Sequence, residues 1–177
     1  MTRAALCAAL ALAAVALAPG CRRESKVVDE RLLVSLEEAR AWQHRADTHL
    51  ADHDVAGALA DVDQVLKIDF PKNSPEGEEA RLDAWARLAK LHLGPTAADE
   101  TRALADVERG RPEATRDSFY RAHLETVAGE ILEARGNRLA PTDADGAKAA
   151  RRDALAAYAR SIEIDRRVQA ALLKETP

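Results

Sequence analysis

The apolar residues of this chain recur at intervals of three and four, and proline or glycine repeatedly interrupts the recurrence. This spacing puts apolar side chains on one face of an α-helix. The interruptions fall at Phe70-Pro71, Leu93-Gly94-Pro95, Gly110-Arg111-Pro112 and Gly136-Asn137. Proline stops a helix because it cannot donate the next backbone hydrogen bond, and glycine favours a helix end. The sequence therefore predicts a succession of amphipathic helices.

Composition supports an all-α fold. Alanine, leucine, arginine, glutamate and aspartate dominate, and the chain holds two each of Trp, Tyr and Phe. Such residues favour helix and give a sheet few β-branched or aromatic side chains. The predicted helical stretches form three pairs and one terminal piece: residues 32–50, 55–68, 82–92, 97–110, 112–135, 154–164 and 168–173. Thr96 and Asp99 suit a capping box, and Asp145 or Thr142 suits the cap of the helix that follows the loop at 141–146.

The helical pairs share a register. A tryptophan is followed four residues later by a small residue, and an alanine follows in the second helix, twelve residues further in the first pair and fourteen in the second: Trp42, Ala46, Ala58 and Trp85, Ala89, Ala103. The third pair has Gly129 as the small residue and Glu125 in place of tryptophan, and it ends in Ile164-Asp165 as the first ends in Ile68-Asp69. This pattern resembles the tetratricopeptide-repeat family.

The resemblance implies a right-handed superhelical stack of about three helix-turn-helix repeats plus a terminal capping helix, over residues 29–177. The small residues at 46, 58, 89 and 129 would let paired helices approach closely, and the tryptophans would fill the gaps between neighbouring hairpins. These positions are therefore expected to be structural.

The resemblance also implies an inner, concave groove built by the first helix of each repeat. Its expected lining is of mixed charge and consists of Arg40, Gln43, Asp47, Asp83, Lys90, His123, Thr126, Glu130 and Glu133. Such a groove suits an extended peptide or a partner helix. The alternatives are that these are solvated helix faces, and that binding uses the convex side or a partner helix at the end of the stack. A seam at the last helix could instead serve self-association, so the oligomeric state is left open.

The N-terminus has the pattern of an export signal. Arg3 precedes an unbroken apolar run over residues 4–18, which is shorter than the roughly 20 residues a membrane-spanning helix needs. Residues 1–20 are therefore predicted to be a signal peptide, and residues 21–28 a tether. Cys21 follows Leu17-Ala18-Pro19-Gly20 and resembles the modified cysteine of bacterial lipoproteins. The alternative is secretion with cleavage after Ala18, for which proline at the next position is poorly suited.

Lipidation at Cys21 would hold the protein at a membrane surface through acyl chains. Because Arg22 stands after the cysteine and not aspartate, the lipoprotein resemblance favours the outer membrane, facing the periplasm. Loss of residues 1–20 removes Arg3 and leaves 25 basic against 30 acidic residues, a net charge of −5. A mildly acidic chain with scattered basic residues gives no basic surface for nucleic acid.

No pattern of a catalytic nucleophile, phosphate-binding loop or carboxylate pair stands out, so no enzyme activity and no cofactor are expected. The alternative function is a periplasmic metal- or small-ligand-binding protein that uses His44, His49 and His53. His49 and His92 share a repeat position, which favours packing, so no metal site is assigned. Asp143-Ala144-Asp145-Gly146 lacks the terminal ligands of a calcium loop. The expected function is a scaffold that binds a protein or peptide partner in the cell envelope.

Overall fold

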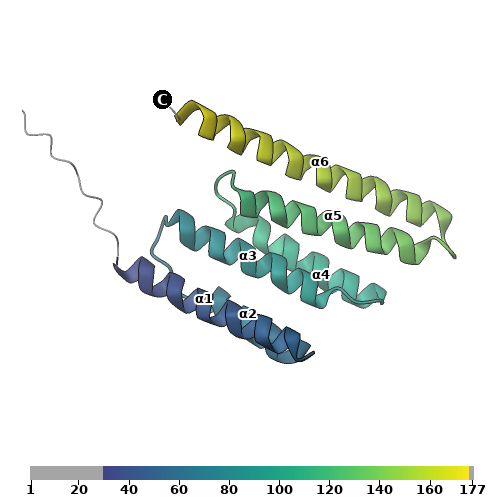
Figure 1. The fold of residues 1–177 in the computed structure, drawn as a ribbon. Helices are drawn as coiled ribbons and strands as arrows, with labels where there is room; N and C mark the ends of the chain where they lie inside the picture. Colours follow the sequence, from purple (N-terminus) through teal and green to yellow (C-terminus); the bar gives the residue numbers. More distant parts are fainter. Residues whose placement is uncertain (1–29, 176–177) are drawn as a thin grey trace, which may run out of the picture.

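The computed structural model describes residues 30–175, and the predicted signal peptide, Cys21 and tether lie outside them. The described residues are all-helical, as the composition predicts, and contain no strand. They form α1 (Glu30–Ala51), α2 (Val55–Lys67), α3 (Pro75–His92), α4 (Ala97–Gly110), the 3₁₀ turn η1 (Arg111–Glu113), α5 (Phe119–Leu139) and α6 (Ala144–Glu175). Figure 1 shows α1 and α2 at the bottom, α3 and α4 side by side above them, then α5, and α6 at the top.

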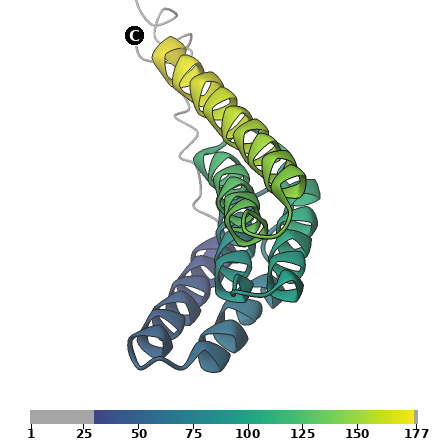
Figure 2. The ribbon, with the colours of Figure 1, turned by 90° about the vertical axis from the view of Figure 1, so that its right-hand side faces the viewer.

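The helices pack as three hairpins, α1/α2, α3/α4 and α5/α6. Each hairpin contacts the next through its first helix: α3 packs on α1 and α2, and α5 packs on α3 and α4. Figure 2 shows the first hairpin and α6 at opposite ends of the stack. As a result α1, α3 and α5 lie side by side, which brings residues far apart in sequence onto one surface.

Two apolar cores hold the hairpins together. One combines buried side chains of α1, α2 and α3, and the other combines those of α3, α4, α5 and α6. Trp85 packs against both cores, and Trp42 packs against the first. Trp85 therefore fills the space between neighbouring hairpins, as expected for it.

The small residues of the shared register lie where helices approach closely. Ala46, Ala58 and Ala89 are buried in the core. Gly129 is buried on α5, and a Cβ atom there would lie 2.5 Å from the Tyr158 ring on α6. Paired helices leave no room for a larger side chain at this point.

One helix start agrees with the prediction and another differs from it. The capping box of Thr96 and Asp99 is present, with each side chain accepting from the other's backbone N–H. However, α3 begins at Pro75 and not near Leu82, because the Ser74 hydroxyl accepts from the Gly77 N–H and caps the helix. Residues 75–81, before the predicted start at Leu82, therefore form the first turns of α3.

The segment around Pro112 does not start the third pair of helices. Pro112 lies in the turn η1, and α5 begins only at Phe119, where Ser118 accepts from the Arg121 N–H. At its other end α5 continues through Gly136 to Leu139. Gly136 is buried, and a Cβ atom there would lie 2.9 Å from the Arg151 side chain on α6. This glycine therefore permits close packing and does not end the helix.

The last helix also differs from the prediction. The Asp143 carboxylate, and not that of Asp145 or the Thr142 hydroxyl, accepts from the Gly146 N–H at 2.9 Å. The separate terminal helix expected over residues 168–173 is wrong, since these residues continue α6 without a break. In Figure 1 the C-terminal end of α6 extends past the start of α5.

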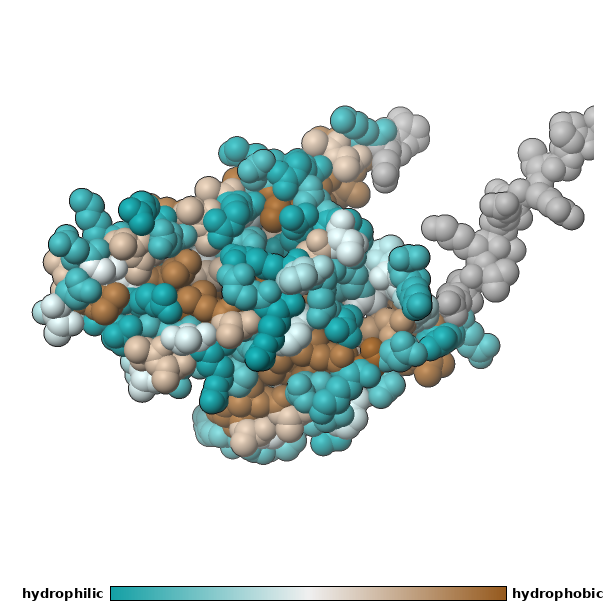
Figure 3. Space-filling model, turned by 180° about the vertical axis from the view of Figure 1, so that it is seen from behind, coloured by the Kyte–Doolittle hydropathy of each residue, from teal (hydrophilic) through white to brown (hydrophobic). Residues whose placement is uncertain are grey.

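The side turned away from the viewer in Figure 1 carries an apolar seam. Figure 3 shows apolar side chains gathered in the lower part of this side. A cavity of about 340 Å³ lies between α2 and α4, and α3 contributes Trp85 and Leu88 to its lining.

Of the helices in residues 30–175, none combines the length and the apolar character that crossing a membrane requires.

Candidate functional site

The side-by-side helices α1, α3 and α5 form the surface on which the groove was expected; we call it the α1–α3–α5 face. A cavity of about 380 Å³ opens on it. Its lining comes from these three helices and consists of Leu36, Ala39, Arg40, Gln43, Glu76, Glu79, Ala80, Asp83, Arg87 and Tyr120. The cavity is thus mostly polar, with carboxylates and guanidinium groups on the same walls.

Hydrogen bonds across the cavity join α1 to α3. Gln43 Nε2 donates to Asp83 Oδ2 at 2.9 Å, and Arg87 Nε donates to the same oxygen at 2.9 Å. A second nitrogen of Arg87 donates to Asp47 Oδ1 at 2.9 Å. Because these side chains restrain one another, the cavity holds them in a fixed arrangement. Binding of a ligand would therefore cost less side-chain conformational entropy.

Arg87 is the cation that pairs with the Asp83 and Asp47 carboxylates on this wall. Burial opposes its charged form, but the carboxylates of Asp83 and Asp47 outweigh burial and hold the pKa of Arg87 above its usual value. The Arg87 side chain is 36% exposed, so part of the guanidinium remains open to solvent. A bound peptide could therefore reach both a cation and its carboxylate partners.

The face continues from α3 onto α5. Lys90 Nζ lies 3.3 Å from Glu130 Oε2 and connects the two helices. His123 stacks on Phe119 with 6.0 Å between ring centroids. Burial, and next the positive charge of Lys90, lower the pKa of His123 below its usual value, which favours the neutral imidazole. This part of the face offers a neutral donor or acceptor beside an exposed aromatic ring.

Two of the predicted groove residues point elsewhere. Thr126 Oγ1 lies 2.9 Å from Ser161 Oγ, which is buried on α6. Glu133 Oε2 accepts from the Tyr158 hydroxyl on α6 at 2.9 Å. Both side chains therefore join α5 to α6 within the last hairpin and do not line the cavity.

The remaining seven predicted residues fall into two groups. Arg40, Gln43 and Asp83 line the cavity, and Asp47 is joined to it through Arg87. Lys90, His123 and Glu130 lie further along the face. Sequence reasoning missed Arg87, which links the first group. Its position four residues after Asp83 was an available signal, because side chains at that spacing share one helix face.

Two of the histidines, His49 and His92, contact carboxylates within their own hairpins. His49 Nδ1 lies 2.8 Å from Asp54 Oδ2, and its Nε2 lies 3.6 Å from Asp61 Oδ2. His92 Nδ1 lies 2.5 Å from Asp106 Oδ2, where the Asp106 side chain is 2% exposed. His49 and His92 share a repeat position, as Asp61 and Asp106 do, so an equivalent His–Asp pair lies between the two helices of two successive hairpins, in hydrogen-bond contact in the second hairpin and 3.6 Å apart in the first.

This geometry bears on the metal alternative. Within the part of the chain that the structure describes, no three His, Cys, Asp or Glu side chains are grouped so that they could hold a metal ion. His53 sits in the turn after α1 with a positive φ of 60°. His44, His49 and His53 therefore do not form the shared site on which that alternative depends.

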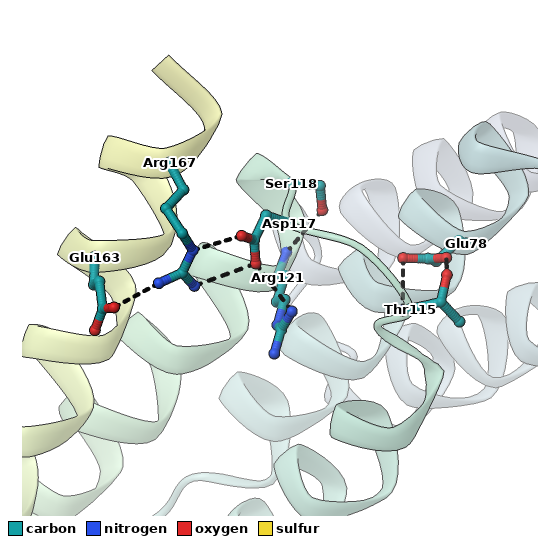
Figure 4. A network of polar contacts seen from close by, with 7 residues as sticks. All are labelled: Glu78, Thr115, Asp117, Ser118, Arg121, Glu163 and Arg167. Carbon is teal, nitrogen blue, oxygen red and sulfur yellow. Dashed lines mark hydrogen bonds and ion pairs between the residues drawn. The ribbon is translucent and has the colours of Figure 1, made fainter. Parts of the chain in front are cut away.

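The loop over residues 114–118 is tied to two hairpins, as Figure 4 shows. Thr115 donates its backbone N–H to Glu78 Oε1 on α3 at 3.1 Å, and its hydroxyl bonds the other oxygen. Arg167 on α6 donates to Asp117 Oδ2 at 2.6 Å and holds the pKa of Asp117 below its usual value. These contacts replace the helix predicted to start at Pro112.

Comparison of the chain with protein-family models, with curated proteins and with solved structures gave no match.

Proposed function

We propose that this chain is a tetratricopeptide-like scaffold of the cell envelope that binds a protein or peptide partner on its α1–α3–α5 face and catalyses no reaction. The observation that carries the proposal is the cavity crossed by the bonds of Gln43, Asp83, Arg87 and Asp47. Backbone amides and charged side chains of an extended peptide would find donors and acceptors already oriented there. In this proposal the hairpins follow the right-handed superhelix of the family, so the face is its concave side.

The location of the protein forms a second part of the proposal. Acyl chains on Cys21 would anchor it to a membrane, with the outer membrane, facing the periplasm, as the proposed site. Support comes from the apolar run and the Leu17–Cys21 pattern. Mass spectrometry of the protein extracted from membranes should show an acylated N-terminal Cys21, and Cys21→Ala should yield a protein without acyl chains. An unmodified N-terminus starting at Pro19 would contradict the anchor.

The binding face can be tested by site-specific photocrosslinking in the cells that make the protein. A photoreactive residue replaces Arg40, which lines the cavity, or Arg102, which is exposed on α4. The proposal expects a defined protein adduct from position 40 and none from position 102. The position-40 adduct should fall several-fold when Arg87→Met removes the charge that orders Asp47 and Asp83.

Arg121→Met is the matched control, because Arg121 pairs with Asp117 away from the cavity. Adducts of equal yield at positions 40 and 102, or an adduct at position 40 that Arg87→Met leaves unchanged, would refute use of this face.

A further inference from the structure

The outer side of α6 carries apolar side chains that no other helix covers. Leu155, Ile162 and Leu173 are 69%, 51% and 78% exposed. Together with Arg151 and Arg166 they follow one another at intervals of four, seven, four and seven residues, counted from Arg151. These intervals place all five side chains on one helix face, which we call the α6 outer face.

The first hairpin has apolar residues at the positions that correspond to Leu155 and Ile162. Aligning Ile164-Asp165 with Ile68-Asp69 places Leu155 at Leu59 and Ile162 at Leu66. The burial patterns agree with this alignment, since α2 buries Ala58, Asp61 and Val65 where α6 buries Ala154, Ala157 and Ser161. The two helices therefore turn equivalent faces toward their own hairpin partners.

In the first hairpin this face is covered by a helix. Leu59 and Leu66 are partly buried against the core that α1, α2 and α3 share. Leu59 lies in a cavity lining with Trp85 and Leu88 of α3, and the Leu66 carbonyl oxygen accepts from Arg81 of α3. In the last hairpin no helix of residues 30–175 occupies the equivalent place, as the position of α6 at the end of the stack shows in Figure 2.

A shallow apolar cavity adjoins this face. It measures about 300 Å³ and is lined by Glu133, Asn137, Arg151, Ala154, Leu155 and Tyr158. The Tyr158 hydroxyl satisfies Glu133, and Arg151 donates to Asn137 at 3.3 Å. The polar groups at its rim thus already have partners, which leaves the apolar floor available for one side chain of a partner.

Most of the exposed charged side chains beside the apolar positions are basic, and the acidic Asp165, three residues after Ile162, is half-buried. Lys148, Arg151 and Arg166 are exposed. No ion pair with another described residue is formed by Lys148 or Arg166. The nearby Glu163 is engaged with Arg167 at 2.7 Å. A second copy of the chain would bring the same basic side chains against these, so charge complementarity favours a different, acidic partner.

We propose that the α6 outer face binds an amphipathic α-helix of a partner protein, with the apolar stripe of that helix on Leu155 and Ile162 and its aspartate or glutamate side chains beside Lys148, Arg151 and Arg166. The partner helix takes the place that α3 takes on α2. This surface is separate from the α1–α3–α5 face, so the proposal stands whether or not that face binds a peptide.

The test uses the full-length chain in a nonionic detergent and two fluorescein-labelled synthetic helices. Both peptides carry leucine at the a and d positions of three heptads; one has glutamate at e and g, and the other has lysine there. Fluorescence anisotropy measures binding, with detergent alone as the blank. The glutamate peptide is expected to bind at least about tenfold more tightly than the lysine peptide, and the difference should shrink as salt is added.

Two variants of the α6 outer face and one control locate the contact. Leu155→Ser with Ile162→Ser, and Lys148→Glu with Arg166→Glu, are each expected to weaken binding of the glutamate peptide by roughly tenfold or more. Leu33→Ser with Val34→Ser removes two exposed apolar side chains from α1 and should leave binding unchanged. All six positions are exposed, so folding of the variants is preserved, which circular dichroism checks.

Equal binding of the two peptides, or equal binding by all variants, would overturn the proposal. Sedimentation of the full-length chain distinguishes the other occupant: a dimer that Leu155→Ser with Ile162→Ser dissociates would assign the face to a second copy and would also overturn it. Loss of binding in the α6 variants leaves the photocrosslinking result at position 40 unaffected, so the two proposals fail separately.

Discussion

Gly129 offers a direct test of the packing between α5 and α6. In Gly129→Ala the new Cβ would lie 2.5 Å from Cε1 and 2.7 Å from Cδ1 of Tyr158. Carbon atoms in contact are normally about 3.5–4.0 Å apart, so the ring must move by roughly 1 Å. That movement stretches the 2.9 Å hydrogen bond from the Tyr158 hydroxyl to Glu133. The substitution therefore disturbs the contact that orients the last hairpin.

The magnitude follows from opposing contributions to the free energy of unfolding. Alanine favours the helix over glycine by about 1 kcal/mol. Overpacking costs about 1–3 kcal/mol, and weakening a hydrogen bond near solvent costs about 0.5 kcal/mol. Gly129→Ala should therefore destabilise the protein by about 1–2 kcal/mol. In a Tyr158→Ser background the ring is absent, and the same change should stabilise it by about 1 kcal/mol.

Urea unfolding of the full-length chain, followed by far-ultraviolet circular dichroism, measures both effects. A double-mutant cycle should give a coupling of roughly 2–3 kcal/mol between positions 129 and 158. If Gly129→Ala stabilises the protein in both backgrounds, or if the two substitutions are additive, the close approach of α5 and α6 at Gly129 is refuted.

Two further predictions concern the last helix and a buried ion pair. Asp143→Ala should lower the free energy of unfolding by about 0.5–2 kcal/mol, because Asp143 caps α6. Asp145→Ala, which removes no cap, should change it by less than about 0.5 kcal/mol. Equal losses for the two variants in urea unfolding would contradict the assignment of the cap. Glu100 is 2% exposed and accepts from Arg138 at 2.7 and 2.8 Å; these bonds outweigh burial and hold the pKa of Glu100 below 4.5. A carboxylate whose pKa is lowered by folding contributes its full stability above the pKa of the unfolded state, so wild type should lose this stability progressively as the pH falls from about 4.5 through the lowered pKa of the folded state. Glu100→Gln should cost about 1–3 kcal/mol at neutral pH and show a smaller loss in acid, and identical pH profiles would refute the role of this pair.

Sequence patterns predicted a residue's role correctly where its contacts lie within its own helix or helical pair. The capping box at Thr96 and the small residues of the shared register were readable because their partners lie three or four residues away or in the paired helix. The same local reasoning was wrong at Pro112 and Gly136, because contacts with another helix decide those positions. Arg151 on α6 packs over Gly136, and Asp117 next to α5 is held by Arg167 of α6. At Asp145 it was wrong for a local reason, since the Asp143 carboxylate two residues earlier accepts the Gly146 N–H.

The predicted groove shows the same division. Register placed Arg40, Gln43, Asp47 and Asp83 on one surface because helical periodicity fixes which side chains share a face. It could not separate Thr126 and Glu133 from that surface, since their direction depends on how α6 packs against α5. Charge partners across helices, such as Arg87 and Asp47, also require the packed arrangement.

The sequence by itself determined the helical class and the pairing of helices, because the period of apolar residues and the proline and glycine breaks act within a few residues. It also determined the residues that must be small where paired helices meet. Only the tertiary structure decided which polar side chains restrain one another on the α1–α3–α5 face, and that Leu155 and Ile162 of α6 stay exposed where Leu59 and Leu66 of α2 are covered. The physical reason is that burial depends on the neighbouring hairpin, and the last hairpin of the described residues has none on its outer side.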